Sequence, residues 1–157
     1  MEIPLVLNGE KLIQHAGFSF VYSEEHEQAK WIAYVLNNKE LDGTLDRSDN
    51  FRKDPSVSSG SAENSDYAKS GYDRGHLAPA ADMKWSEKAM SESFYYSNMS
   101  PQLPAFNRGI WKVLEEKVRD WALENDSILI VTGPILPSKN QKKLATIGPN
   151  SVAVPEY

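Results

Sequence analysis

Four consecutive residues, Asp73-Arg74-Gly75-His76, place a carboxylate, a guanidinium and an imidazole around one glycine. An arginine can donate two hydrogen bonds to a phosphate, and a histidine can accept a proton near neutral pH. The glycine allows a close approach to the backbone. Because Pro79 disfavours helix in the residue before it, we expect the motif at a strand end or in a loop. These residue types suit acid–base chemistry on a phosphate ester, although such a short motif also fits an exposed polar turn.

A second group of polar residues accompanies the strongest predicted helix, over about 107–125. Its apolar residues recur at spacings of four, four and three: Ile110, Leu114, Val118 and Trp121. We expect them to form one stripe that faces the core. At about 100° per residue, Asn107 falls near the centre of this stripe, and Glu115 and Arg119 lie along its border. An inward Asn near a carboxylate suits a hard cation that keeps most of its waters. A capping Asn with a surface ion pair is the structural alternative.

The remaining patterns predict a mixed α+β fold. Residues 17–22 alternate aromatic side chains and residues 31–36 form a second apolar run, and the charged turn between them indicates a hairpin. Ser127–Thr132 is a short β-branched run that we expect as a buried strand. Ser86 suits the N-cap of a helix over 86–93. The order lacks the regular strand–helix alternation of a doubly wound parallel fold.

Length and composition bound the class of protein. The chain has 157 residues, 40% hydrophobic and 25% charged, which predicts one globular domain over residues 1–157. No apolar run approaches the roughly 20 residues of a membrane span. The absence of cysteine removes disulfides and thiolate metal sites. A formal net charge of −5 argues mildly against a tight nucleic-acid partner. The polar stretch Asp54–Ser70 is expected as a long surface loop.

Three motifs in chain order resemble the DNA/RNA non-specific endonucleases, the ββα-metal or His-Me finger nucleases. They are Asp73-Arg-Gly-His76, the Ser-Asn-Met-Ser-Pro-Gln segment over 97–102, and the run from Asn107 to Glu115. The resemblance covers nearly the whole chain, from about residue 3 to residue 157. It implies an α+β fold with a central, mostly antiparallel sheet flanked by helices. Members of the family usually continue past the equivalent of residue 157, so the resemblance also implies that the C-terminal portion of the fold is missing.

The resemblance implies roles for the central residues. His76 would be the general base that deprotonates the attacking water. Asn107 would be the only direct protein ligand of a Mg²⁺ ion, with Mn²⁺ or another divalent cation as the alternative, and Glu115 would hold some of its waters. Asn98 would orient groups around His76 or the metal waters. The expected products carry a 5′ phosphate.

The resemblance also implies that basic residues around these groups contact the substrate. Arg74 and Arg119 would face the phosphate, with Asp73 beside them in the catalytic motif. An upstream arginine of the family has two candidates here, Arg47 and Arg52, and their spacing does not choose between them. Arg108 completes the predicted substrate-binding set.

We therefore predict a metal-dependent endonuclease that cleaves DNA and RNA without preference for sequence or sugar. Binding to phosphates rather than base edges explains this indifference, and local arginines with a cation can hold phosphate despite the acidic net charge. The alternatives are a catalytically silent nuclease-like binding domain and a nuclease restricted to one type of nucleic acid. The resemblance favours a secreted or periplasmic location, although the N-terminus shows no signal peptide. A homodimer, and pairing with the remaining C-terminal piece, stay open.

Overall fold

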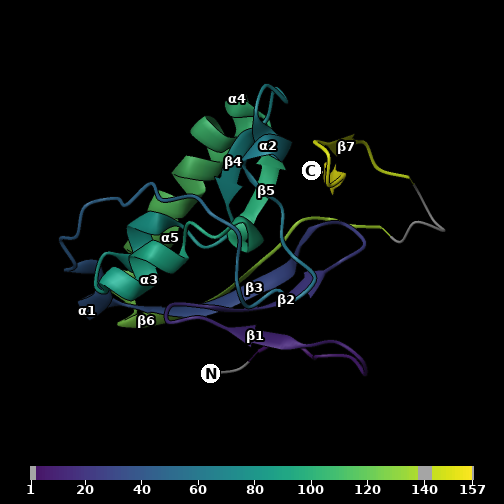
Figure 1. The fold of residues 1–157 in the computed structure, drawn as a ribbon. Coiled ribbons are helices and arrows are strands. Elements are labelled where there is room, and N and C mark those ends of the chain that lie inside the picture. Colours follow the sequence, from purple (N-terminus) through teal and green to yellow (C-terminus); the bar gives the residue numbers. More distant parts are fainter. Residues whose placement is uncertain (1–2, 138–142, 157) are drawn as a thin grey trace.

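The computed structural model describes residues 3–137 and 143–156 of the chain (Figure 1). Its largest sheet has four antiparallel strands in the order β1-β2-β3-β6. Strands β2 and β3 form the predicted hairpin, and β6 pairs with the other edge of β3. The four strands span Leu12–Gln14 (β1), Ser19–Ser23 (β2), Gln28–Asn37 (β3) and Ser127–Thr132 (β6).

One face of this sheet forms the main core. Phe20 of β2 and Ile32, Tyr34 and Leu36 of β3 are at most 2% exposed and belong to one hydrophobic cluster. Alternate residues of a strand point to the same face, so these side chains all lie on one side. Figure 1 shows that α2, α3, α4 and α5 lie on one side of the sheet. The aromatic alternation in the sequence therefore predicted the strand, whose five residues are all buried.

One long helix and several short helical segments complete the fold. The long helix, α5, spans Lys112–Glu124 and contacts β3 and β6. Helix α3 spans Glu87–Glu92, and its predicted N-cap is confirmed because the Ser86 side chain accepts a hydrogen bond from the Ala89 amide. The other segments are α1 (Asn38–Leu41), α2 (Asn64–Tyr67), α4 (Pro104–Phe106), the 3₁₀ turns η1 (Ala80–Met83) and η2 (Tyr96–Asn98), and the π turn η3 (Asn107–Trp111).

A second, two-stranded sheet carries the chemical motif. Strand β4 is Asp73–His76, and it pairs antiparallel with β5, Met99–Gln102, so that His76 lies opposite Met99. Gly75 sits against the side chain of Gln102, where a Cβ atom would fall about 2.2 Å from it. Segments α4, η3 and α5 follow directly after β5. Two strands and a helix thus form one unit above the main sheet, and a further pair, β7 (Thr146–Ile147) and β8 (Val152–Ala153), lies near the C-terminus.

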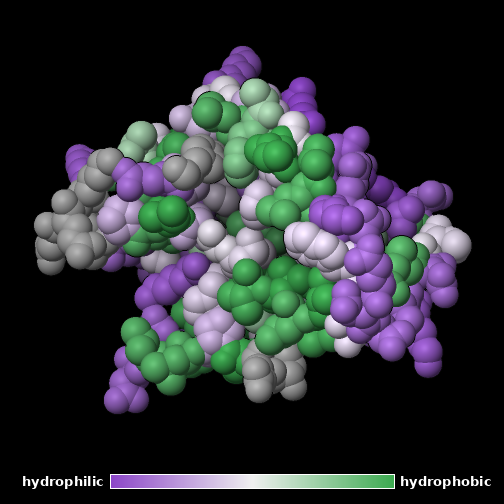
Figure 2. Space-filling view, turned by 180° about the vertical axis from the view of Figure 1, so that it is seen from behind, coloured by the Kyte–Doolittle hydropathy of each residue, from purple (hydrophilic) through white to green (hydrophobic). Residues whose placement is uncertain are grey.

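Strand β6 is correctly predicted in its bounds, but the prediction that it is buried was wrong. Ile128 and Ile130 pack against the core, whereas Leu129 and Val131 are 45% and 50% exposed. Alternate residues of a strand point to opposite faces, so Leu129 and Val131 lie on the face away from the core, where Val35 of β3, paired with Leu129, is also 38% exposed. Figure 2 shows a broad apolar area on the face opposite to the view of Figure 1.

The apolar stripe predicted on the long helix is only partly a core face. Val118 packs against the core, but Ile110, Leu114 and Trp121 are 65%, 44% and 42% exposed. The π turn changes the phase of the helix, and Gly109 leaves helical geometry there with φ −106° and ψ −111°. A constant 100° per residue therefore cannot relate the first turn to the rest of α5. Between α5 and β6, a cavity of about 210 Å³ also remains.

The prediction of a surface loop over 54–70 was wrong in part. The segment contains α2, and its carboxylates Asp54 and Asp66 are only 2% and 1% exposed. Asp66 accepts hydrogen bonds from the Glu63 amide and from both nitrogens of Asn150. Polar residues can be buried when hydrogen bonds satisfy them, and composition alone does not reveal such partners. Within the described ranges, we find no helix that is both long and apolar enough to span a membrane.

Candidate active site

One cavity of about 390 Å³ brings together most of the predicted site residues. It lies between β4, the π turn and the start of α5. The predicted residues that line it are Arg47, Arg74, His76, Asn107, Arg108 and Glu115. A neighbouring groove of about 350 Å³ shares four of them and adds Asp73. Motifs separated by more than thirty positions in the sequence therefore meet at one place, whereas three predicted residues, Arg52, Asn98 and Arg119, line neither space.

His76 is the best candidate for a general base. It is 8% exposed, and its Nε2 atom has no hydrogen-bond partner among residues 3–137 and 143–156. The ring bonds to the main chain of Arg74, and the edges of Phe51 and Phe94 pack around it. Burial, followed by the positive charges of Arg47 and Arg74, lowers the pKa of His76 to about 3. The imidazole is therefore neutral at pH 7 and can accept a proton at Nε2.

This buried neutral imidazole should make stability depend on pH. His76 has a pKa of about 3 in the fold against 6.5 when unfolded. Between these values the unfolded state binds more protons, so the stabilisation present above pH 6.5 is lost as the pH falls. Each pH unit between these two pKa values costs about 1.4 kcal/mol. As the pH falls, the free energy of unfolding of wild type should therefore drop by on the order of 4 kcal/mol more than that of His76→Asn. Urea unfolding of both chains from about pH 7.5 to 3.5 measures the difference, and parallel curves would contradict it.

Arg74 and Arg47 supply positive charge to the cavity. The guanidinium carbon of Arg74 lies 3.9 Å from the centre of the Phe51 ring, and one nitrogen reaches Asn64 at 3.5 Å. Arg47 bonds Asp49 at 2.6 Å and lies over Phe94 at 4.8 Å. A guanidinium over an aromatic face is held by a cation–π interaction, which orients Arg74 without using all its donors. Phe51 is thus a site residue whose role the sequence did not reveal.

Arg52, the other upstream candidate, has a structural position. It donates to the Ser91 carbonyl at 2.7 Å and to the Ser91 hydroxyl at 2.9 Å, and its guanidinium lies 4.1 Å from the centre of the Tyr95 ring. Its donors are therefore used to attach its segment to α3. The geometry favours Arg47 over Arg52 as the upstream arginine that meets a phosphate.

Asp73 orients residues of the π turn. Its Oδ2 atom accepts a hydrogen bond from Nδ2 of Asn107 at 3.0 Å, and Arg108 donates to both carboxylate oxygens at 2.8 and 2.7 Å. The bonds from Arg108 hold the pKa of the Asp73 carboxyl below its usual range. Because Nδ2 of Asn107 is occupied, Oδ1 is the atom that remains for a ligand. Asp73 therefore affects the cavity by orienting the side chains of Asn107 and Arg108.

Glu115 and Arg119 lie on successive turns of α5 but have different surroundings. Glu115 lines the cavity, and burial followed by the nearby Asp82 carboxylate raises its pKa to about 7. Arg119 donates to Asp82 at 2.9 Å, and Tyr34 donates to the other oxygen at 2.8 Å. The Asp82 side chain is fully buried, so this ion pair ties α5 to η1 and β3. Arg119 is thus held by Asp82 and does not line the cavity, and its contact with a phosphate stays a prediction.

Asn98 holds the backbone that follows β4 and does not line the cavity. It is fully buried, and its Oδ1 atom accepts from the Ala78 amide at 2.8 Å. Its Nδ2 atom donates to the carbonyls of Ala78 and Ser93 at 2.9 and 2.8 Å. The amide therefore fixes the backbone two residues beyond His76, and its contacts are with main-chain atoms.

The donor set of the cavity fits a hard cation with few protein ligands. Among the residues that the structure describes, no three His, Cys, Asp or Glu side chains form a group able to hold a metal ion. The cavity does present Oδ1 of Asn107 and the carboxylate of Glu115. Oxygen ligands in this small number suit Mg²⁺, which usually keeps several of its waters.

This fold and site define a known class. Residues 4–157 match the DNA/RNA non-specific endonuclease family, and the chain belongs to that family. It is 38% identical over 155 residues to human mitochondrial endonuclease G, covering 94% of this chain and 52% of that protein. It is also 38% identical over 152 residues to the mitochondrial nuclease of Saccharomyces cerevisiae, covering 89% of this chain and 46% of that protein. The chain thus spans about half the length of these curated relatives.

A solved structure confirms the fold. The chain matches a chain in the crystal structure of the EndoG/EndoGI complex with a TM-score of 0.82 and 33% identity, covering 92% of this chain and 63% of that one. The predicted α+β architecture, an antiparallel sheet flanked by helices, is therefore confirmed. The names of the relatives contain the word mitochondrial, which does not agree with the secreted or periplasmic location that the resemblance favoured.

Proposed function

We propose that the protein is a metal-dependent endonuclease that hydrolyses phosphodiester bonds of DNA and RNA and leaves 5′-phosphate ends. The supporting observation is the unpartnered Nε2 atom of a neutral, buried His76 in the same cavity as Asn107 and Glu115. A base and a charge sink at the leaving oxygen are the two groups that phosphodiester hydrolysis requires. Membership of the nuclease family supports the same reaction.

In this proposal the base acts on a water molecule. Nε2 of His76 takes a proton as the water oxygen attacks phosphorus, and the bond from phosphorus to the 3′ oxygen breaks. The guanidinium groups of Arg74 and Arg47 hold the non-bridging phosphate oxygens. A Mg²⁺ or Mn²⁺ ion at Oδ1 of Asn107, with waters held by Glu115, would stabilise the negative charge on the leaving oxygen. The phosphate keeps its bond to the 5′ oxygen, so one product ends in a 5′ phosphate and the other, whose leaving oxygen takes up a proton from water, ends in a 3′ hydroxyl.

The cavity also accounts for cleavage without sequence preference. Its basic lining residues are Arg47, Arg74, Arg108 and Lys112. These groups recognise phosphate oxygens, which carry no sequence information. Although the chain has a formal net charge of −5, this cluster gives local attraction for a polyanion. Binding should weaken steeply with salt, because each contacted phosphate releases counterions.

The assay is cleavage of supercoiled plasmid and of RNA in Mg²⁺, with EDTA as the metal-free control. We expect nicking and linearisation of plasmid, degradation of RNA, and DNA ends that a ligase joins without prior kinase treatment. Because the chain spans about half the length of its relatives, the 157-residue chain and any longer natural form are both assayed. Cleavage of only one substrate would indicate a restricted nuclease, and binding without cleavage in every form would indicate a silent domain.

A further inference from the structure

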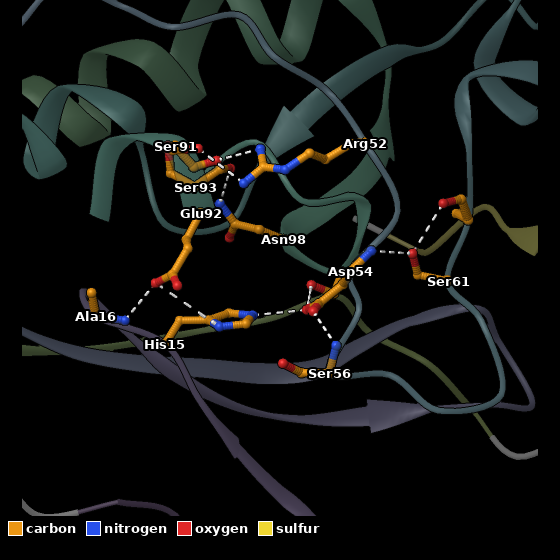
Figure 3. A network of polar contacts seen from close by, with 12 residues as sticks. His15, Ala16, Arg52, Asp54, Ser56, Ser61, Ser91, Glu92, Ser93 and Asn98 are labelled. Atoms are coloured by element: carbon orange, nitrogen blue, oxygen red, sulfur yellow. Dashed lines mark hydrogen bonds and ion pairs between the residues drawn. The ribbon is translucent and has the colours of Figure 1, made fainter. Parts of the chain in front are cut away.

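A buried carboxylate behind the active site joins three separate parts of the chain. Oδ2 of Asp54 is 2.8 Å from Nε2 of His15, at the end of β1, and also accepts a hydrogen bond from the Ser97 hydroxyl in η2 (Figure 3). Oδ1 accepts from the Ser56 amide at 2.8 Å. The side chains of His15 and Asp54 are 4% and 0% exposed. Such a satisfied, buried polar network fixes one arrangement of the segments that it connects.

The other side of His15 is also engaged. Its Nδ1 atom lies 4.0 Å from Glu92 of α3, and the same carboxylate oxygen accepts from the Ala16 amide at 2.7 Å. Tyr95 packs against the imidazole with ring centres 5.1 Å apart. The histidine therefore lies between two carboxylates and joins the sheet to the helical layer, as Figure 3 shows.

Ser97, Asp54 and His15 are residue types of a nucleophilic triad, but their geometry excludes that role. Both the serine and the histidine bond the same oxygen of the aspartate, so the histidine does not contact the hydroxyl. Ser97 is also fully buried, which leaves no access for a substrate. In a triad the histidine must lie between the nucleophile and the acid. A positional role remains.

The network is directly connected to the active-site strand by two routes. Phe51 lies three residues before Asp54. Its ring stacks under the guanidinium of Arg74 and packs against the ring of His76. One residue after Ser97, Asn98 holds the backbone that follows β4. The segments themselves are joined, because Arg52 and Tyr95 form a parallel bridge. Movement of Asp54 would therefore displace both supports of β4.

We propose that His15 and Asp54 are positioning residues for the nuclease reaction. Through Phe51 and Asn98 they hold the catalytic strand, and neither touches the substrate. This inference rests on the proposed function. A displacement of reacting groups by about 1 Å can cost on the order of 10²-fold in rate. Arg74, which lies over Phe51, is one of four basic residues that line the cavity, so loss of the network should lower kcat much more than it raises KM.

Two substitutions of His15 isolate its bond to Asp54. In His15→Gln the amide nitrogen can occupy the place of Nε2 and keep a donor to Asp54. In His15→Asn the shorter side chain places its amide near the position of Nδ1, out of reach of Asp54. The matched control is His26→Asn, because His26 is also buried in the hairpin region but bonds Ser23 and the Pro137 carbonyl.

We expect kcat of His15→Asn to fall about 10- to 100-fold at temperatures well below unfolding, with KM within about twofold. His15→Gln should recover most of kcat, and His26→Asn should change it less than about twofold. Equal kcat values for the Asn and Gln variants, or a comparable loss in His26→Asn, would overturn the proposal.

Hydrogen exchange gives a readout that does not need activity. The Leu77 and Ala78 amides bond the Asn98 main chain and side chain, respectively. If His15 positions this strand, both amides should exchange about tenfold faster in His15→Asn and remain protected in His15→Gln. If neither the 157-residue chain nor a longer natural form cleaves nucleic acid, the proposed nuclease function fails, while exchange still decides whether His15 positions the backbone that follows β4. Unchanged protection in His15→Asn would refute the positioning role even where wild type cleaves.

Discussion

Replacing His76 with alanine should lower kcat for plasmid cleavage by about 10³-fold, within the range that general bases contribute. Among the described residues, no other histidine lines the cavity, and in the proposed mechanism the Glu115 carboxylate holds waters of the cation. The guanidinium groups that line the cavity are permanently charged and cannot accept a proton. The affinity for nucleic acid should change little, because those groups remain in place.

The matched control for this change is His26→Ala, which removes another buried histidine outside the cavity. Fluorescence anisotropy with a short DNA duplex in Ca²⁺ tests whether affinity is kept. Added imidazole should restore part of the His76→Ala rate, because truncation leaves space beside the attacking water. A His76→Ala chain that retains more than about a tenth of wild-type kcat would assign the proton transfer to another group.

Local sequence patterns predicted the elements of this fold better than their surroundings. Aromatic alternation identified the hairpin, and the β-branched run identified the bounds of β6. Periodicity reports which side chains share a face, but not whether a neighbouring element covers that face. Leu129 and Val131 therefore looked like core residues but are about half exposed on the face of the sheet away from the core. The spacing of apolar residues does not reveal the π turn. A projection at a constant 100° per residue therefore placed Ile110 on the core face.

For the site, the motifs predicted which residue types meet but not every partner. His76 and Asn107 line one cavity because β4 pairs with β5 and the short helix α4 leads from β5 into the π turn. The spacing could not separate Arg47 from Arg52, since their roles depend on contacts with α3 and the aromatic residues around them. The ion pair of Arg119 with the buried Asp82 was not predicted, because the two residues are distant in sequence. Pairs between residues so distant in sequence do not show in the spacing of apolar or polar residues.

Asn107→Ala should abolish most Mg²⁺-dependent cleavage, lowering kcat/KM by about 10³-fold, because several kcal/mol of charge stabilisation depend on the cation. Alanine removes Oδ1, the amide oxygen that Asp73 leaves free by accepting from Nδ2. Initial rates over a Mg²⁺ titration measure the effect as a loss of the saturable response. The matched control is Asn125→Ala, which removes an amide at the other end of α5 that bonds the Trp121 carbonyl.

Asn107→Asp tests separately the oxygen that would bind the cation and the hydrogen bond that orients it. The new carboxylate keeps an oxygen for the cation but loses the donor to Asp73, and two negative oxygens would then face each other about 3.0 Å apart. We expect a loss that is partly reversed by Asp73→Asn in the same chain, which restores a donor–acceptor pair. The double variant also removes one charge from the bond to Arg108, so full recovery is not expected. An Asn107→Ala chain with wild-type Mg²⁺ dependence would show that the cation binds elsewhere.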